Sequence, residues 1–515
     1  MKYDVIVIGA GSAGSAAATR LSEDPQISVL LLEAGPDYPD FETLPDELKF
    51  GYATGTDIMV SDEHNWQYTG KANEIAETML VPRGKVTGGT SAINGQVFLR
   101  GLTDDFNDWS TQGNKLWTFE EVLPFFRNLE TDMDFHDDFH GSDGPIICHR
   151  FKRDDWLPSQ TAFYNACIEA GFPHVTDFNQ PDSHGVGAIP CNNPNGIRFS
   201  TSIGYLAQAR HRVNLTIKAN CVARRLLFDG LSVTGVEVES GGENFVVEGE
   251  QIVLSSGTIA NAQLLMLSGI GPSDHLKEVG IDLVLDLPGV GKNFSDHPLI
   301  FVTAKVKENV TLDGLAPRLQ VGLRYTANGS IRPNDMMMWM QSFATERVNR
   351  GGNRMEGLGI RIVGSIYLAS SKGQITLKSN DPNDQPFLDF HLLEDPEDLR
   401  RLREAVRIAV DLLKHSEFDE IIEKRLEPLD SDLDSEDSLN KWLLKEVTTG
   451  QHLTGTCKMG QSSDQMAVVD EKLRVHGVEG LQIADASIMP NTVRANTNAT
   501  TIMIGERVAA FLKNN

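Results

Sequence analysis

The feature that most constrains the fold is a glycine cluster that follows an apolar run near the start of the chain. Tyr3 to Ile8 is apolar and β-branched, and Gly9-Ala10-Gly11-Ser12-Ala13-Gly14 comes directly after it. A helix-forming, alanine-rich stretch continues from Ser12 to Leu21, and a second apolar run covers Ser28 to Leu32. This order of strand, turn, helix and strand predicts a βαβ unit on a parallel sheet.

The same cluster has the spacing of a dinucleotide-binding turn. Gly9 permits a tight turn, Gly11 lets the backbone approach a pyrophosphate at the helix N-terminus, and Gly14 lets the helix pack on the strand. Glu33 follows 19 residues after Gly14, where its carboxylate can accept hydrogen bonds from adenosine ribose hydroxyls. The pattern predicts FAD or NAD without separating them. The contacts expected in this unit come from Gly9, Gly11, Ser12, Ala13, Gly14, Glu33 and Ala34.

Length and charge narrow the class of protein. With 515 residues the chain is longer than one hydrophobic core usually serves, which predicts two domains or one domain with a large insertion. Its 72 acidic and 46 basic residues give a formal charge of -26, which repels phosphate backbones and anionic lipid headgroups. Nucleic acid is therefore not an expected partner.

Cysteine spacing and apolar patterning indicate the compartment. The five cysteines are widely spaced and form no CxxC pair, which argues against a disulfide framework or a zinc site, and no metal is expected. The opening MKYDVIVIGAG lacks a cleavable signal pattern, and no apolar stretch approaches the roughly 20 residues that span a membrane. We therefore expect a cytoplasmic protein without an integral membrane segment.

Later segments extend the first sheet and indicate a second one. From Leu215 to Val253 short apolar and polar runs alternate, which predicts a meander of antiparallel strands. Leu481 to Ala484 and Thr500 to Leu512 are typical of a strand and a helix that return to the first domain. Between about 300 and 445, strand-like stretches precede an amphipathic helix from Asp395 to Lys414, which predicts a separate substrate domain.

Two long stretches rich in glycine and hydroxyl residues carry a more specific signal. Residues 84–95 have the sequence GKVTGGTSAING, and residues 256–272 have the sequence SGTIANAQLLMLSGIGP. They resemble the two signatures of the glucose-methanol-choline (GMC) oxidoreductases. Further matches are PGVGKNFSDH at 288–297, HLTGTCKMG at 452–460, DASIMP at 485–490 and NTN at 496–498. The resemblance covers nearly all of the chain and is weakest between about 300 and 445.

The resemblance implies a fold and a cofactor. The expected fold class is α/β, with a Rossmann-type FAD-binding domain and an α+β substrate domain built on an antiparallel sheet. The FAD-binding domain would be discontinuous, with residues 1–155, 190–300 and 445–515, and the substrate domain would contain residues 156–189 and 301–444. Position 93 is isoleucine, where members with a covalent flavin can carry histidine. FAD is therefore expected to bind without a covalent link.

The resemblance also assigns residues to the site. His452 matches the family's active-site histidine and would be the base, since a neutral imidazole is available near neutral pH. Asn496 matches its partner, and its amide would orient the substrate oxygen as negative charge develops. Gln451 precedes His452 and would line the substrate cavity. Further FAD contacts are expected from Trp66, Val86, Asn94, Gly95, Gln96, Val97, Val222, Asp485, Ala486 and Thr497.

These assignments predict an enzyme. The expected reaction is FAD-dependent oxidation of a small-molecule alcohol to an aldehyde or ketone, with hydride passing to flavin N5. Oxygen, a quinone or another carrier would accept the electrons, and the protein would be a monomer or a dimer. Two alternatives stay open: lyase or photodecarboxylase chemistry on the same fold, and a flavin-binding protein without catalysis.

Two further features have a structural and a functional interpretation. His136 and His140 have a spacing that could suit a metal, yet their segment resembles an ordinary turn of the family and is expected to be structural. The Met336 to Met340 stretch, which contains Trp339, predicts either plain core or an apolar wall of the substrate cavity.

Overall fold

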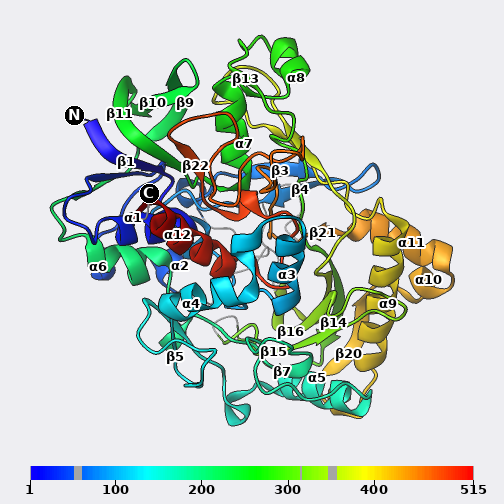
Figure 1. The fold of residues 1–515 in the computed structure, drawn as a ribbon. Helices are drawn as coiled ribbons and strands as arrows, with labels where there is room; N and C mark the ends of the chain where they lie inside the picture. The colour runs from blue at the N-terminus through cyan, green and yellow to red at the C-terminus, as the bar shows by residue number, and fades with distance from the viewer. Residues whose placement is uncertain (1, 51–60, 314–315, 346–356, 514–515) are drawn as a thin grey trace.

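Two large sheets organise the computed structural model, which describes residues 2–50, 61–313, 316–345 and 357–513. Figure 1 shows strands of the first sheet at the upper left and strands of the second at the lower right. The α/β class predicted from the sequence is confirmed. None of the described helices combines the length and the apolar character that crossing a membrane requires.

The first sheet contains the predicted βαβ unit. Its strands lie in the order β8-β2-β1-β11-β10-β9, with β22 paired to β11. The bounds are β1 (Lys2–Ile8), β2 (Val29–Leu32), β8 (Leu215–Lys218), β9 (Val222–Asp229), β10 (Ser232–Ser240), β11 (Glu243–Leu254) and β22 (Leu481–Ile483). Residues 5–8 of β1 and all of β2 are buried, because these central parallel strands are covered on both faces.

Helices pack against this sheet and against one another. Helix α1 (Ser12–Leu21) begins as the glycine pattern predicts, and it packs along the closing helix α12 (Thr497–Lys513) (Figure 1). Helix α12 also contacts α4, and α7 lies against β9. The bounds of the further helices on this side are α3 (Thr103–Thr111), α4 (Phe119–Leu129), α6 (Ala207–Ala209), α7 (Gly257–Leu267) and α8 (Ser273–Glu278).

The prediction of one antiparallel meander from Leu215 to Val253 is wrong at its first strand. Strand β8 pairs parallel with β2, and only β9, β10 and β11 form antiparallel pairs. Strand β8 lies at the edge of the sheet, so its side chains alternate between buried and more exposed positions. Alternation reports that one face is exposed and carries no information on strand direction.

The second sheet is antiparallel and belongs mainly to the middle of the chain. Its order is β20-β14-β17-β16-β15-β7, with β21 paired to β14. The bounds are β7 (Gly185–Ala188), β14 (Pro298–Val306), β15 (Val321–Tyr325), β16 (Met336–Thr345), β17 (Gly357–Ile366), β20 (Ile422–Glu427) and β21 (Thr448–Thr449). Helices α5 (Pro158–Glu169) and α9 (Pro396–Leu412) pack on this sheet (Figure 1). Helices α10 (Asp430–Leu433) and α11 (Glu436–Glu446) follow.

A smaller sheet joins segments from both predicted domains. Strands β3 (Tyr68–Lys71) and β4 (Thr78–Val81) pair with each other, and β3 also pairs with β19 (Phe387–Asp389), which pairs with β18 (Gln374–Thr376). The exact division into domains stays a prediction. The remaining short elements are α2 (Asp46–Lys49), β5 (Glu130–Asp132), β6 (Ile146–Cys148), β12 (Ile270–Gly271) and β13 (Leu285–Asp286).

Candidate active site

A cavity of about 670 Å³ brings residues of both large sheets together. Its lining includes the turn after β1, strands β14 and β16, and the segment around His452. All of the predicted site residues line it except Gly14 and Val86. Those that do are Gly9, Gly11, Ser12, Ala13, Glu33, Ala34, Trp66, Asn94, Gly95, Gln96, Val97, Val222, Gln451, His452, Asp485, Ala486, Asn496 and Thr497.

The turn after β1 leaves its backbone open to the cavity. Gly9 has a φ of +99°, which favours glycine. A Cβ on Gly14 would lie 1.9 Å from the carbonyl oxygen of Gly9, so Gly14 serves the packing of helix on strand. A Cβ on Gly11 would find Cα of Gly89 at 3.9 Å as its nearest neighbour. The protein therefore has room at Gly11, and a ligand can approach the backbone there.

Glu33 is fixed by backbone groups at the end of β2. Its two carboxylate oxygens accept hydrogen bonds from the backbone N–H groups of Ala10, at 3.0 Å, and Gly35, at 2.9 Å. Burial raises the pKa of Glu33 to about 7. A hydroxyl group that donates to this carboxylate would favour its charged form, which suits the predicted contact with a ribose.

The loop of residues 84–95 packs directly on the glycine turn. The backbone N–H of Gly88 donates to the carbonyl of Ala10 at 2.7 Å, and a Cβ on Gly89 would lie 2.6 Å from Cα of Gly11. Val86 does not line the cavity, contrary to the position expected for a cofactor contact, because its side chain belongs to a separate apolar cluster. That cluster contains Leu48, Val86, Ala92 and Ile93.

Asp296 holds the segment that carries His452. This buried carboxylate accepts hydrogen bonds from the backbone N–H of His452 at 2.8 Å, from its neighbour His297 at 2.7 Å, and from the hydroxyl of Thr449. Burial raises the pKa of Asp296 to about 6. The backbone around the catalytic candidate is thereby tied to the start of β14.

His452 lies in a chain of hydrogen bonds. Its Nε2 is 2.8 Å from Nδ2 of Asn496, and the hydroxyl of Tyr367 donates to Oδ1 of Asn496 at 3.2 Å. On the other side of the ring, Nδ1 of His452 is 2.9 Å from Nδ1 of His297. The structure therefore brings the two predicted catalytic residues, 44 positions apart in sequence, into direct contact.

The hydrogen bonds assign a tautomer to His452. Because the amide nitrogen of Asn496 can only donate, Nε2 of His452 is an acceptor and Nδ1 carries the proton, which it donates to His297. Burial, and then the positive charge of Arg83, lower the pKa of His452 to about 3. Burial and the neighbouring His452 also lower the pKa of His297 well below its usual value. Both rings are neutral near pH 7.

Arg83 forms hydrogen bonds with Gln451. A guanidinium nitrogen of Arg83 donates to both the backbone carbonyl and Oε1 of Gln451, each at 3.0 Å. Gln451 has a φ of +66°, an unusual conformation for a residue with a side chain, and its amide nitrogen is 3.4 Å from the carbonyl of Leu80. Gln451 lines the cavity, but its polar group is already engaged by the protein.

Three residues of this site were missed from the sequence, namely Arg83, His297 and Tyr367. His297 ends the stretch 288–297 that resembles the family, which was a signal that could have identified it. Tyr367 follows β17 directly and its ring stacks on His297, with centroids 4.2 Å apart. Arg83 directly precedes the first long motif. Neither Arg83 nor Tyr367 stands out from its local sequence, because their roles come from packing.

Strand β16, which contains the Met336 to Met340 stretch, has both predicted roles, as core and as a wall of the cavity. Met337 and Trp339 line the cavity, whereas Met336, Met338 and Met340 are buried without lining it. Alternate side chains of β16 point to opposite faces of the sheet, so one strand supplies core on one side and an apolar wall on the other.

The comparisons with known proteins identify the family. Residues 3–299 and 369–505 match the two family models described as GMC oxidoreductase. The chain belongs to the GMC oxidoreductase family. It is an FAD-dependent enzyme that acts on CH–OH groups of its donors, as the sequence motifs predicted.

Curated relatives and solved structures agree with this assignment. This oxidoreductase is 38% identical to the oxygen-dependent choline dehydrogenases of Burkholderia vietnamiensis and Burkholderia lata over 540 residues, covering 99% of this chain and 93% of each relative. The crystal structure of pyridoxine 4-oxidase from Mesorbium loti has a TM-score of 0.91 and 27% identity, with all of both chains covered. The Aspergillus oryzae RIB40 formate oxidase structure shares the fold, with a TM-score of 0.90 at 24% identity, covering 100% of this chain and 98% of the other.

The residues of this GMC oxidoreductase fit FAD. The backbone at Gly11 is open, and no atom lies within 4 Å of the position that a Cβ of Gly95 would take. At the start of α12, Oδ1 of Asn498 accepts from the Ser12 hydroxyl at 2.8 Å, while its Nδ2 is buried without a hydrogen-bond partner. Asn498 lines the cavity, so a cofactor oxygen is a suitable acceptor for this amide.

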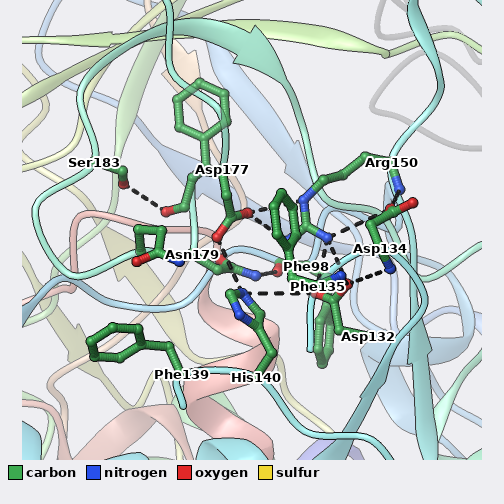
Figure 2. Close-up of polar contacts among 12 residues, drawn as sticks. Phe98, Asp132, Asp134, Phe135, Phe139, His140, Arg150, Asp177, Asn179 and Ser183 are labelled. Atoms are coloured by element: carbon green, nitrogen blue, oxygen red, sulfur yellow. Dashed lines mark hydrogen bonds and ion pairs between the residues drawn. The ribbon is translucent and has the colours of Figure 1, made fainter. Parts of the chain in front are cut away.

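Figure 2 shows a second cluster of charged side chains, around His140 and Arg150, whose members are not among the residues that line the cavity. Glu130, Asp132 and His140 offer possible ligand atoms within 4.8 Å of one another. However, Asp132 pairs with Arg150 at 2.9 Å, Glu130 pairs with Arg100, and His140 is 3.2 Å from Asp177. These groups are engaged in buried ion pairs, and His136 is exposed outside them. The arrangement supports the structural interpretation of this histidine segment.

Replacing Arg150 with methionine is expected to destabilise the protein. The guanidinium of Arg150 bonds Asp132 and Asp177, which are both buried, so its removal leaves His140 as the remaining basic group between two buried carboxylates (Figure 2). The expected loss in the free energy of unfolding is about 3–5 kcal/mol. The matched control is Lys152→Met, which removes an exposed partner of Asp134 and should cost less than about 1 kcal/mol. Urea unfolding of both variants measures the difference, and equal midpoints would contradict the prediction.

Proposed function

We propose that this oxidoreductase converts an alcohol into an aldehyde or ketone, with Nε2 of His452 as the base. The observation that carries the proposal is the contact between Nε2 of His452 and the amide of Asn496 in the lining of the cavity. Bound FAD supplies the acceptor, at flavin N5, for the hydride that leaves the alcohol carbon. The protein must supply the base for the hydroxyl proton and the groups that hold the oxygen.

Two side chains would position the substrate oxygen. The hydroxyl of the alcohol takes the place of the Asn496 amide at Nε2 of His452, and the amide then donates to the oxygen as negative charge develops. The hydroxyl of Tyr367 donates to Oδ1 of Asn496, which keeps the amide nitrogen directed towards His452. The proton moves to Nε2 of His452, and the ring becomes positively charged during the reaction.

His297 is a positioning residue in this proposal. Its Nδ1 accepts a hydrogen bond from Nδ1–H of His452, which keeps Nε2 of His452 free to act as a base. Without that acceptor, the His452 ring loses the partner that selects its tautomer and fixes its orientation.

The role of His297 predicts a difference between two variants. His297→Asn keeps an acceptor near the same place and should retain flavin reduction within about tenfold, whereas His297→Leu should lose about 10²-fold. The measurement is the rate of flavin reduction by alcohol under nitrogen, with FAD content and unfolding temperature recorded for both. Equal rates for the two variants at equal FAD content would contradict the role assigned to the acceptor.

The experiment that tests the proposal is the visible spectrum of the purified holoenzyme under nitrogen. Aliphatic, aromatic, amino and sugar alcohols are added in turn, and we expect one class to bleach the flavin band. Admission of air then distinguishes oxygen from another electron acceptor by the rate at which the band returns. A yellow protein that no alcohol bleaches would refute alcohol oxidation, and would favour lyase or photodecarboxylase chemistry, or flavin binding alone.

A further inference from the structure

One face of the second sheet forms the apolar wall of the cavity. Leu299 and Phe301 on β14, and Met337 and Trp339 on β16, all line it. Phe301 and Trp339 are both in register with Val363 of β17, so they belong to the same row across the sheet. Strand β14 begins immediately after His297, which contacts His452. The apolar wall therefore starts beside the proposed base.

The carboxylates in the described lining of the cavity follow strands β2 and β22 of the first sheet. They are Glu33 and Asp485, and each is engaged by backbone groups. Glu33 binds the N–H groups of Ala10 and Gly35. Asp485 accepts from the backbone N–H of Gly257 at 2.7 Å, as well as from Asn261 and Ser487. Among the described residues, no carboxylate of the second sheet lines the cavity.

Two aromatic rings in the lining of the cavity, those of Tyr367 and Phe301, each have one face occupied by another side chain. Quaternary ammonium groups bind over the faces of aromatic rings, usually in a cage of several. The ring of Tyr367 stacks on His297 at an angle of 13°, and the guanidinium of Arg361 lies 4.4 Å from the centroid of Phe301. Arg83 and Arg318 also line the cavity.

We propose that the substrate is an uncharged alcohol with an apolar body, aromatic or branched aliphatic, and that choline is discriminated against. This inference rests on the proposed alcohol oxidation. A trimethylammonium group would give up its water for an apolar wall whose described residues offer it no carboxylate, whereas a neutral group of the same shape gains from the transfer. The proposed substrate therefore differs from the one that names the choline dehydrogenases to which this chain is similar.

The test compares two alcohols of the same shape. In 3,3-dimethylbutan-1-ol a carbon replaces the quaternary nitrogen of choline, so charge is the main difference between them. For the holoenzyme under nitrogen, the apparent second-order rate constant of flavin reduction should be at least about tenfold higher for the neutral alcohol. Benzyl alcohol should also reduce the flavin. Equal rates, or a preference for choline, would overturn the inference while leaving alcohol oxidation intact.

A binding measurement separates this inference from the proposed chemistry. In the His452→Ala holoenzyme, perturbation of the flavin spectrum reports binding of each alcohol without turnover. The neutral alcohol should bind at least about tenfold more tightly, which is about 1.4 kcal/mol. Equal dissociation constants would overturn the inference. If no alcohol, including these two, reduces the flavin of the wild-type enzyme, the proposed function is wrong, and the substrate inference is wrong with it.

A negative charge placed on the apolar wall should shift the substrate preference towards choline. Gln341 lies on the same face of β16 as Trp339, lines the cavity, and has a buried Oε1 without a hydrogen-bond partner. Gln341→Glu adds a carboxylate of the same size and should raise the choline to 3,3-dimethylbutan-1-ol rate ratio at least about fivefold. The control Gln26→Glu changes an exposed glutamine outside the cavity and should leave the ratio unchanged. An unchanged ratio in Gln341→Glu would show that the charge of the wall does not govern selection.

Discussion

His452→Ala is expected to slow alcohol-dependent flavin reduction by about 10²–10⁴-fold, the range that a positioned general base contributes. The reason is that Nε2 of His452 is the acceptor that meets Asn496 in the cavity, and burial keeps its ring neutral. Stopped-flow absorbance under nitrogen measures the rate. Retained FAD in the purified variant would show that the loss concerns chemistry and not the cofactor.

A matched variant controls for the loss of a histidine. His184 is exposed and does not line the cavity, so His184→Ala should reduce its flavin at the wild-type rate. If His452→Ala retains reduction within about tenfold of wild type, another group takes the hydroxyl proton and the assignment of the base is wrong.

Gly11→Ala is expected to weaken the binding of FAD while the protein still folds. Gly11 has φ -79° and ψ -160°, which alanine adopts without strain, and the nearest protein atom to the added methyl group is 3.9 Å away. The methyl group would occupy the space through which a pyrophosphate approaches the backbone. Overpacking of this kind costs about 1–3 kcal/mol, or roughly 5- to 150-fold in the dissociation constant of FAD. Titration of the apoprotein with FAD measures the change.

Gly14 provides a contrasting variant, in which stability rather than FAD binding should change. Gly14→Ala would place its methyl carbon 1.9 Å from the carbonyl oxygen of Gly9, so the fold itself must shift and the apoprotein should unfold at lower temperature. We expect apoprotein of Gly11→Ala to unfold at the wild-type temperature. An unchanged dissociation constant for FAD in Gly11→Ala would contradict the role of that position.

The elements predicted from local sequence agree closely with the structure. Helix α1 has the predicted bounds, and β1 and β2 differ from the predicted strands by one residue each. The pattern of β-branched residues, glycine and alanine constrains the backbone within a few residues, so no distant contact is needed to recognise it. The direction of β8 was not predictable in this way, because an edge strand alternates in either direction.

The catalytic candidates show where local inference ends. His452 and Asn496 were assigned through resemblance to a family, and nothing in their immediate neighbours demands that they meet. Their contact depends on the return of α12 to the first sheet and on Asp296, which ties the His452 segment to the start of β14. The same packing brings His297 to the second nitrogen of the His452 ring.

By itself, the sequence determined the βαβ unit, the glycine turn that FAD needs, the family and the type of reaction, because each is encoded in residues close together in the chain. Only the tertiary structure decided which side chains line the cavity and which support it. Val86 lies outside the lining, Tyr367, Met337 and Trp339 line the cavity, and His297 contacts His452 without lining it. Side-chain neighbours depend on the pairing of distant strands and on the packing of the core. Those arrangements follow from the energy of the whole chain, not from any one segment.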